Sequence, residues 1–425
     1  MAVNTMHGCT SYNDWSRRNV LRGVALGGIS WLTGIPSALA NLTVRPKSER
    51  DTLVVLFLRG GADGLNIVVP YGEDAYHRSR PSLGLGAPNG ARLGDRTLDL
   101  DGFFGFHPAL APILPLYKDG HLACIHAIGS GDGTRSHFEA MSAMERGLNN
   151  LGPGSSTVNG WIARYLNETA DPTDSPLRAV AIGDVMPDSL RGAISASALA
   201  ELNDYKLNGS PTFQKGLESR YASGADEMAV AGRETLDVLR TLNRLDYKGY
   251  RPQGGATYPT SDLGNGLRQV AFLQKAEVGL EVAFLDKGGW DTHVAQGGST
   301  GWQAGLLTDV AQSLQAFAAD MGSRMNRTTV IVMTEFGRRA YENSGLGTDH
   351  GRGSVMFALG GHVLGGKVHG QWPGLEEHQL EGPGDLRVTT DYRRVLAEAL
   401  SKRMGVTAPG AIFPSFEYSP VQIFN

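Results

Sequence analysis

The chain has 425 residues, of which 41% are hydrophobic, and a formal net charge of −4 at pH 7. This length allows one large α/β domain or two smaller ones, with a substantial core. A net negative charge without a basic stripe argues against a nucleic-acid-binding protein.

Residues 1–40 have the features of an export signal. The basic segment SRRNVLRG precedes a moderately apolar run and Ala38-Leu39-Ala40, which is typical of a cleavage site. Arg17 and Arg18 resemble the twin-arginine signal, which would make the twin-arginine translocase a partner during export. An ordinary secretory signal or a membrane anchor is the alternative, although the run is short and glycine-rich for a membrane span. We therefore expect residues 41–425 to form a periplasmic or secreted bacterial protein.

The expected mature chain carries a formal charge of about −6, because residues 1–40 hold three arginines and one aspartate. No later stretch is long and apolar enough to cross a bilayer. Cys124 stands alone after the signal, so an intramolecular disulfide is not possible. We expect a soluble domain whose fold needs no oxidative stabilisation.

Five apolar, β-branched runs with glycine- or acid-bearing loops at their carboxyl ends predict strands of a parallel sheet buried on both faces. They cover residues 51–64, 121–133, 177–184, 280–291 and 328–337. Helical patterns are predicted at 107–120, 136–147, 210–245, 299–321 and 391–405. The alternation predicts a doubly wound, mostly parallel α/β sheet with helices on both faces, and residues 185–265 as a helical insertion or cap.

In such a sheet, ligands bind beyond the carboxyl ends of the strands. The first strand end carries Asp63 after two glycines, a pattern that is more often a structural turn when read alone. The second carries Thr134, Arg135, Ser136 and His137 at the start of a helix, and these four are the candidate catalytic residues. Ser136 with Glu139 fits a capping box. The functional interpretation makes Ser136 or Thr134 a nucleophile beside an anion-binding helix start, with Arg135 holding the oxygens of the anion.

The remaining strand ends carry acids and histidines between glycines. Asp291 and His293 are two residues apart in GGWDTHVAQGG, Glu335 ends the run VIVMTE, and Asp349 and His350 adjoin in GTDHGRG. Carboxylate with imidazole suits zinc, manganese or iron, whereas carboxylate alone would suit magnesium or calcium. The predicted divalent-metal ligands are Asp63, Asp291, His293, Glu335, Asp349 and His350.

The ordered motifs LRGGADGLN, GTRSHFEA, GGWDTH, TEFGRR and GTDHGRGSVMFALGGHVLGG resemble the secreted bacterial family called domain of unknown function 1501. That family is similar to the alkaline phosphatase and sulfatase superfamily, so the resemblance implies an alkaline-phosphatase-like fold. It implies metal ligands at Asp63, Asp291, His293, Glu335 and His350, and a hydroxyl nucleophile at Thr134 or Ser136. Phe336 stands where those enzymes carry a histidine ligand, so we expect one metal site to be weak, altered or absent. Cys124 lies outside the motif that formylglycine sulfatases require.

These features predict an exported, metal-dependent hydrolase of phosphate or sulfate esters, acting on a small-molecule or glycan ester. Ser136, Thr134 or a bound water would be the nucleophile, and Arg135 and Arg352 would neutralise charge. The alternative is a secreted binding or accessory protein on the same fold, acting at the cell envelope. A redox protein is disfavoured because no dinucleotide-binding fingerprint is present.

Overall fold

The computed structural model describes residues 50–90, 95–151, 158–171, 173–203, 205, 209–223 and 227–425. The predicted signal at 1–40 lies outside the described residues. The main sheet contains β1 (Thr52–Leu58), β5 (Leu122–Gly129), β6 (Ala179–Ile182), β7 (Ala196–Leu199), β8 (Val282–Lys287), β9 (Thr328–Met333), β12 (Ser354–Gly360), β13 (Val368–His369) and β14 (Thr390–Asp391). All five predicted strands are therefore present.

The order of the strands is β13-β5-β12-β9-β1-β8-β6-β7, with β14 also pairing with β5. The central strand β1 runs parallel to both neighbours, so that Val55 lies opposite Phe284 of β8 and Ile331 of β9. β12 is antiparallel to both β9 and β5, and the other pairs of the sheet are parallel. Every residue of β1, β5, β9 and β12 is buried, which explains their continuous apolar sequences.

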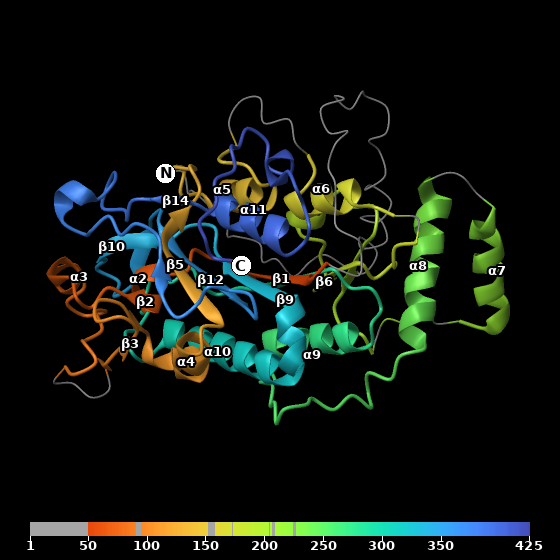
Figure 1. Ribbon diagram of the computed structural model, residues 1–425, viewed down its shortest axis with the longest axis horizontal. Helices are drawn as coiled ribbons and strands as arrows, with labels where there is room; N and C mark the ends of the chain where they lie inside the picture. Colours follow the sequence, from red (N-terminus) through yellow and green to blue (C-terminus); the bar gives the residue numbers. More distant parts are fainter. Residues whose placement is uncertain are drawn as a thin grey trace, which may run out of the picture.

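Helices cover both faces of this sheet (Figure 1). One layer holds α4 (Leu114–Lys118), α9 (Asp262–Lys275) and α10 (Trp302–Met321), and the other holds α5 (His137–Glu145), α6 (Trp161–Glu168) and α11 (Tyr392–Lys402). Alternate residues of β1 divide between the two layers, because Val54 and Leu56 belong to one core cluster and Val55 and Phe57 to the other. The predicted doubly wound α/β fold is confirmed.

Smaller elements surround the edge of the sheet. They are α2 (Gly64–Ile67), β2 (Val68–Val69), α3 (Asp74–Ser79), β3 (Leu98–Asp99), β4 (Gly105–Phe106), the hairpin β10 (Arg338–Glu342) and β11 (Thr348–His350), and the 3₁₀ helices Pro108–Ile113, Asp188–Leu190, Gly322–Arg327, Glu377–Gln379 and Pro409–Ala411. None of the helices in the described ranges is long and apolar enough to span a membrane.

The segment 185–265 differs from the predicted helical cap. It contains α7 (Pro211–Ala222) and α8 (Glu227–Asn243), but also β7, which pairs with β6 at the edge of the sheet. α7 and α8 lie at the end of the molecule opposite β10 (Figure 1). Part of this segment therefore completes the sheet, and its two helices do not cover the strand ends described next.

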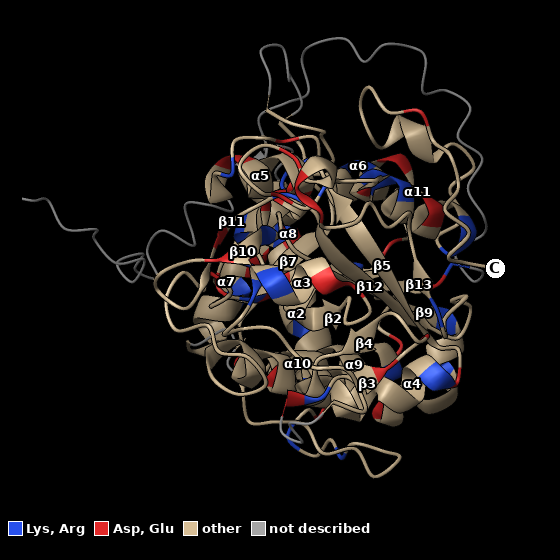
Figure 2. Ribbon diagram, turned by 90° about the vertical axis from the view of Figure 1, so that its left-hand side faces the viewer, with Lys and Arg blue, Asp and Glu red and all other residues tan. Residues whose placement is uncertain are grey.

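The carboxyl ends of β1, β8 and β9 meet at one edge because these strands are parallel. β5 points the same way, since it and β9 are both antiparallel to β12. The loops that follow these four strands are the ones in which the sequence places its acids and histidines. Figure 2 views the molecule from this side. The labels of α5, β11 and β10 lie near one another in the upper left part of the view.

Candidate metal centre

Arg338 connects the loops at this edge through hydrogen bonds from its side chain. Its buried guanidinium donates hydrogen bonds to the carbonyls of Gly61 at 2.7 Å, Thr348 at 2.8 Å and Trp290 at 3.0 Å. It also donates to Asp291 Oδ1 at 2.7 Å. Its donors are thus used on backbone carbonyls and on one carboxylate, which fixes Asp291 relative to three separate segments of the chain.

Three imidazoles converge on the same oxygen of Asp291. The Nε2 atoms of His350, His293 and His137 lie 2.9, 3.0 and 3.4 Å from Oδ1. The Nε2 atoms of His293 and His350 are 2.8 Å apart. Potential ligand atoms of His137, Asp291 and His350 lie within 4.8 Å of one another. We call Asp291, His137, His293 and His350 the histidine cluster.

The opposite nitrogen of each imidazole faces an acceptor. His137 Nδ1 donates to Glu335 Oε1 at 2.8 Å, and His350 Nδ1 donates to the carbonyl of Arg135 at 2.9 Å. His293 Nδ1 donates to Asp349 Oδ1 at 3.3 Å. With hydrogen on Nδ1, each ring turns the lone pair of Nε2 into the cluster, as is usual for metal-binding histidines.

These lone pairs fit a cation. Two Nε2 acceptors 2.8 Å apart repel unless a proton or a metal lies between them. His137 Nε2 is buried and makes no hydrogen bond within the described residues. Asp291 with the imidazoles of His137 and His350 forms a donor set suited to zinc and other divalent transition metals, and His293 Nε2 lies beside this set, 2.8 Å from His350 Nε2. The residues present therefore fit a divalent metal held by the histidine cluster.

The charges around the cluster shift its pKa values in different directions. Burial opposes ionisation of Asp291, but its contacts with His350 and with the Arg338 guanidinium outweigh burial and lower the pKa of this carboxyl. The hydrogen bond to Glu335 raises the pKa of His137. Burial lowers the pKa of His350, which favours the neutral imidazole that metals bind.

Two predicted ligands have other roles. Asp63 is fully buried and forms an ion pair with Arg80, at 2.6 and 2.9 Å, while Gln296 Nε2 donates to it at 2.6 Å. Glu335 is also buried and accepts hydrogen bonds from Gly60 N and His137 Nδ1, each at 2.8 Å. Both carboxylates are held by protein donors, and neither belongs to the group of potential ligand atoms that converge at His137, Asp291 and His350.

Asp349 contacts the histidine cluster through His293 and is not a member of it. Its Oδ1 accepts hydrogen bonds from Asn343 at 2.9 Å and from His293 at 3.3 Å. The hydrogen bond from Asn343 is the main cause of a lowered pKa for Asp349, and His293 and Arg339 add to it. The structure thus gives Asp349 the role of orienting His293. Asp291, His293 and His350 are brought together as the sequence predicted.

The segment predicted to hold the nucleophile divides into several roles. His137, expected to take part in catalysis, joins the cluster as a potential ligand. Thr134 donates its hydroxyl proton to Asp132 at 2.6 Å. Ser136 is the N-cap residue of α5, but its side chain makes no capping hydrogen bond, so the expected capping box is absent. The Ser136 hydroxyl is therefore not occupied by the helix end.

The predicted arginine clamp is not formed. The Arg135 guanidinium pairs with the buried carboxylate of Asp385, with Nε to Oδ2 at 2.8 Å. Arg352 pairs with Glu381. Arg135 instead contributes its backbone, since its φ of 56° is unusual for a residue with a side chain and its carbonyl accepts the His350 hydrogen bond.

Phe336 fills space beside the cluster. Its ring centroid lies 4.9 Å from those of both His137 and His350. A Cβ atom on Gly61, where φ is +69°, would lie 2.4 Å from the Phe336 ring, so this position requires glycine. The apolar ring thus occupies the place where the resemblance implied another ligand.

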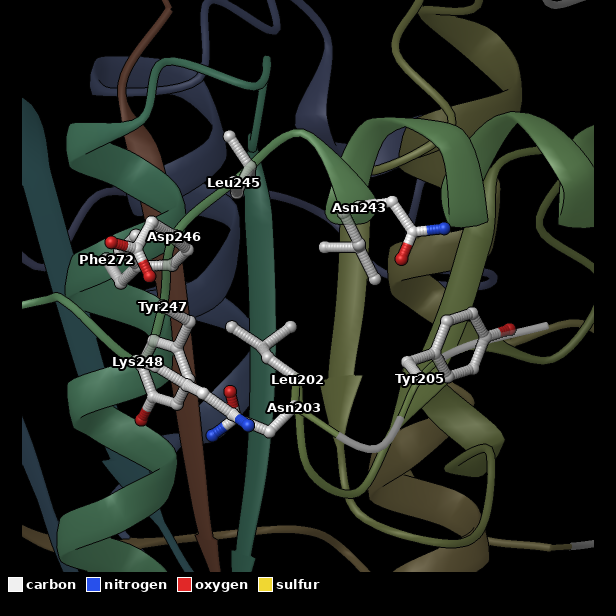
Figure 3. Close-up of a pocket in the computed structure, with 10 residues that line it drawn as sticks. Leu202, Asn203, Tyr205, Asn243, Leu245, Asp246, Tyr247, Lys248 and Phe272 are labelled. Carbon is white, nitrogen blue, oxygen red and sulfur yellow. The ribbon is translucent and has the colours of Figure 1, made fainter. Parts of the chain in front are cut away.

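A cavity of about 290 Å³ lies elsewhere, among the segment after β7, the end of α8 with the segment that follows it, and Phe272 of α9 (Figure 3). It is lined by Leu202, Asn203, Tyr205, Leu242, Asn243, Leu245, Asp246, Tyr247, Lys248 and Phe272. It contains none of the predicted site residues. We assign the functional site to the histidine cluster because that is where groups able to bind a cation converge.

The fold and the cluster define an α/β protein with a candidate metal centre at the carboxyl edge of its sheet. The chain belongs to the family described as protein of unknown function (DUF1501), whose model matches residues 50–413. This confirms the expected family. A comparison with curated protein sequences found no significant match.

Solved structures with similar folds include the C-terminal periplasmic domain of EcEptC from Escherichia coli in complex with Zn. It has 9% identity and a TM-score of 0.37, covering 91% of this chain and 92% of that chain. A protein in the alkaline phosphatase superfamily from Vibrio parahaemolyticus has 12% identity and a TM-score of 0.35, covering 84% and 72%. The phosphonate monoester hydrolase of Agrobacterium radiobacter has 10% identity and a TM-score of 0.32, covering 84% and 74%.

Proposed function

We propose that this protein is an exported, metal-dependent hydrolase of phosphate or sulfate esters. The observation that supports the proposal is the convergence of three Nε2 atoms on Asp291 Oδ1, with each Nδ1 fixed by its own acceptor. Imidazole-rich sets of this kind favour zinc or manganese over calcium or magnesium. A bound metal would polarise the ester oxygen and lower the pKa of a coordinated water.

The residues of the chain would position the reacting groups. The helix α5 directs its first backbone N–H groups toward the carboxyl edge, where they would stabilise an anionic phosphate or sulfate. Ser136 stands at that helix start without a capping bond and is the better candidate nucleophile, because the Thr134 hydroxyl is engaged by Asp132. Water is the alternative nucleophile. Arg338 is buried and paired, so it would position Asp291 without contacting the substrate.

Export through the twin-arginine translocase, with residence in the periplasm or secretion, is part of the proposal and is supported by residues 1–40 of the sequence. A small-molecule or glycan ester is the proposed substrate. The test of export is to express the full chain with Arg17 and Arg18 replaced by lysine and to follow the processed form in the periplasmic fraction.

A non-catalytic accessory protein is the second candidate. Two observations favour it. Asp63 is paired with Arg80, and the apolar ring of Phe336 stands where the resemblance implied a histidine ligand, so two of the implied ligands are not available to a metal. Such a protein would bind metal at the histidine cluster without hydrolysing any ester.

The two candidates differ in a direct assay. The mature protein would be loaded with zinc or manganese and tested on 4-nitrophenyl phosphate, bis(4-nitrophenyl) phosphate and 4-nitrophenyl sulfate, with and without chelator. We expect hydrolysis that chelator and His350→Ala abolish, while His362→Ala, a change at an exposed histidine outside the cluster, leaves it intact. A metal-loaded protein inert on all three esters would reject the hydrolase and favour the accessory protein.

A further inference from the structure

Four large apolar side chains stand exposed beside the histidine cluster. They are Phe138, Val294, Trp302 and Leu346, with exposed fractions of 81%, 72%, 63% and 54%. We call these four residues the apolar rim. Single exposed apolar residues are ordinary, but a group around one polar site marks a surface that binds something.

Each member of the apolar rim is tied to a segment of the cluster. Phe138 directly follows His137 at the start of α5, and Val294 directly follows His293. The indole Nε1 of Trp302 donates to the carbonyl of Gly289 at 2.8 Å, two residues before Asp291. The hydrogen bond and the two sequence adjacencies place these three rim residues on or next to the segments that carry the candidate ligands.

Leu346 joins the rim through the pairing of two loops. Gln296 N donates to the Leu346 carbonyl at 2.9 Å, and Ala295 N donates to the Gly345 carbonyl at 2.9 Å. A Cβ atom on Gly345 would lie 3.5 Å from Val294 Cγ2, which places the two rim-bearing loops in contact.

The backbone of these loops is held in an unfavourable conformation. Ala295 and Leu346 have φ values of 49° and 55°, in the left-handed region that side chains disfavour. Asn343 fixes the pairing, because it donates to the His293 carbonyl at 3.0 Å and accepts from Gly345 N at 2.9 Å. Strain of this kind gathers at binding sites, where it holds side chains ready for a ligand.

We propose that the apolar rim binds the non-polar part of an amphiphilic ester whose anionic group lies at the histidine cluster. This inference rests on the proposed hydrolase function and specifies its substrate class. Burial of alkyl or aryl carbon against Phe138 and Val294 supplies binding energy, while the cluster and the α5 amides take the charged group. The ester is either a soluble monomer or a lipid presented at a surface.

The experiment uses 4-nitrophenyl alkyl phosphates with alkyl chains of one to eight carbons and a constant leaving group. We expect kcat/KM of the metal-loaded protein to rise with chain length, by up to about fourfold for each methylene that the rim buries. Phe138→Ser and Val294→Ser should flatten this dependence. Phe213→Ser on α7 and Val230→Ser on α8 are exposed controls far from the cluster, and they should leave it unchanged.

A second measurement separates this inference from the proposed hydrolysis. Isothermal titration with alkylphosphonates of two to twelve carbons measures binding without turnover. Hydrolysis whose rates and affinities do not depend on chain length would contradict the proposed role of the apolar rim and would remain consistent with the proposed hydrolase. Chain-length-dependent binding without hydrolysis would support the rim and reject the hydrolase. Equal binding by the wild type and both rim variants would also overturn the rim.

A third experiment distinguishes a soluble ester from a lipid ester presented at a membrane surface. Phosphatidylcholine vesicles containing phosphatidic acid are compared with monomeric short-chain phosphatidic acid, with released phosphate as the readout. Faster release from vesicles, lost in Phe138→Ser, supports a lipid surface. Release from monomers alone supports a soluble amphiphile, and both results agree with the rim.

Discussion

Glu335 would act on a metal at the histidine cluster through His137. Its Oε1 accepts the Nδ1 hydrogen of that ring at 2.8 Å and so fixes the direction of Nε2. Carboxylates that orient a metal-binding histidine contribute to affinity although they do not touch the ion. Such a role would explain why the buried carboxylate of Glu335 lies at a strand end beside the cluster without belonging to the converging ligand atoms.

Replacing this orienting carboxylate should weaken metal binding. Glu335→Gln keeps the shape of the side chain but loses the charge, and we expect zinc affinity to fall by about 10- to 100-fold. Competition with a fluorescent zinc chelator measures the change. Glu376→Gln, at an exposed residue that pairs with Arg78 and caps the 3₁₀ helix Glu377–Gln379, is the control. Unchanged affinity in Glu335→Gln would contradict the assigned role.

Asp63 provides the complementary prediction. Its ion pair with Arg80 is fully buried, and breaking such a pair costs about 3–5 kcal/mol. Asp63→Asn should therefore lower the free energy of unfolding, measured by denaturant titration, while the folded protein still binds one equivalent of zinc. Asp291→Asn should lose the zinc. Loss of zinc from a folded Asp63→Asn protein would show that Asp63 is a ligand after all.

The sequence identifies the residue types of the site better than their roles. Asp291, His293 and His350 are recognisable because glycines flank each of them at a strand end. A strand-end carboxylate has the same local sequence whether it meets a metal or an arginine, so Arg80 as the partner of Asp63 is not predictable. The structural role of Arg338 also escaped prediction, because its backbone acceptors are contributed by three distant segments.

At the scale of elements, five strands of the sheet are predictable because their apolar runs are continuous, whereas β12 is not among the predicted strands although all of its residues are buried. The sequence could not show that β12 runs antiparallel between β9 and β5, since direction depends on long-range pairing. β7 was missed because ASAL is short and weakly apolar, and it lies at the edge of the sheet. The region around β7 was consequently predicted as helical only.

A single carboxylate holds the C-terminal segment 421–424 against α11. Glu398 of α11 is buried and accepts hydrogen bonds from the backbone N–H groups of Val421, Gln422, Ile423 and Phe424, at 2.5 to 3.0 Å. Glu398→Ala should lower the free energy of unfolding by about 3 kcal/mol, because buried donors lose a charged acceptor. Hydrogen exchange at residues 421–424 should rise as well. Glu377→Ala, at an exposed position, is the control, and slow exchange in the Glu398 variant would contradict the anchoring role.

At the scale of the whole molecule, stability should fall on acidification. Burial lowers the pKa of His126 to about 4 from an ordinary value of 6.5, although its bond to the Val68 carbonyl acts in the other direction. Below pH 6.5 the unfolded chain binds a proton that the folded chain does not, so folding stability declines between pH 6.5 and 4. The loss should reach about 2.5 kcal/mol at pH 4.5.

Urea titrations at pH 7.5 and 4.5, with chelator present, measure this loss. In His126→Gln the difference between the two pH values should shrink by about the same 2.5 kcal/mol, whatever the variant does to absolute stability. His121→Ala, at an exposed histidine on the preceding turn, should leave the difference as it is in the wild type. An undiminished difference in His126→Gln would assign the acid sensitivity to other groups.

The central claim is that the histidine cluster holds a metal ion. The most direct measurement is anomalous diffraction at the zinc edge from crystals of the zinc-loaded mature protein. We predict one strong peak about 2.0–2.2 Å from Asp291 Oδ1 and the Nε2 atoms of His137 and His350. A peak bound by Asp63, or no peak in a protein with those three residues ordered, would contradict the account.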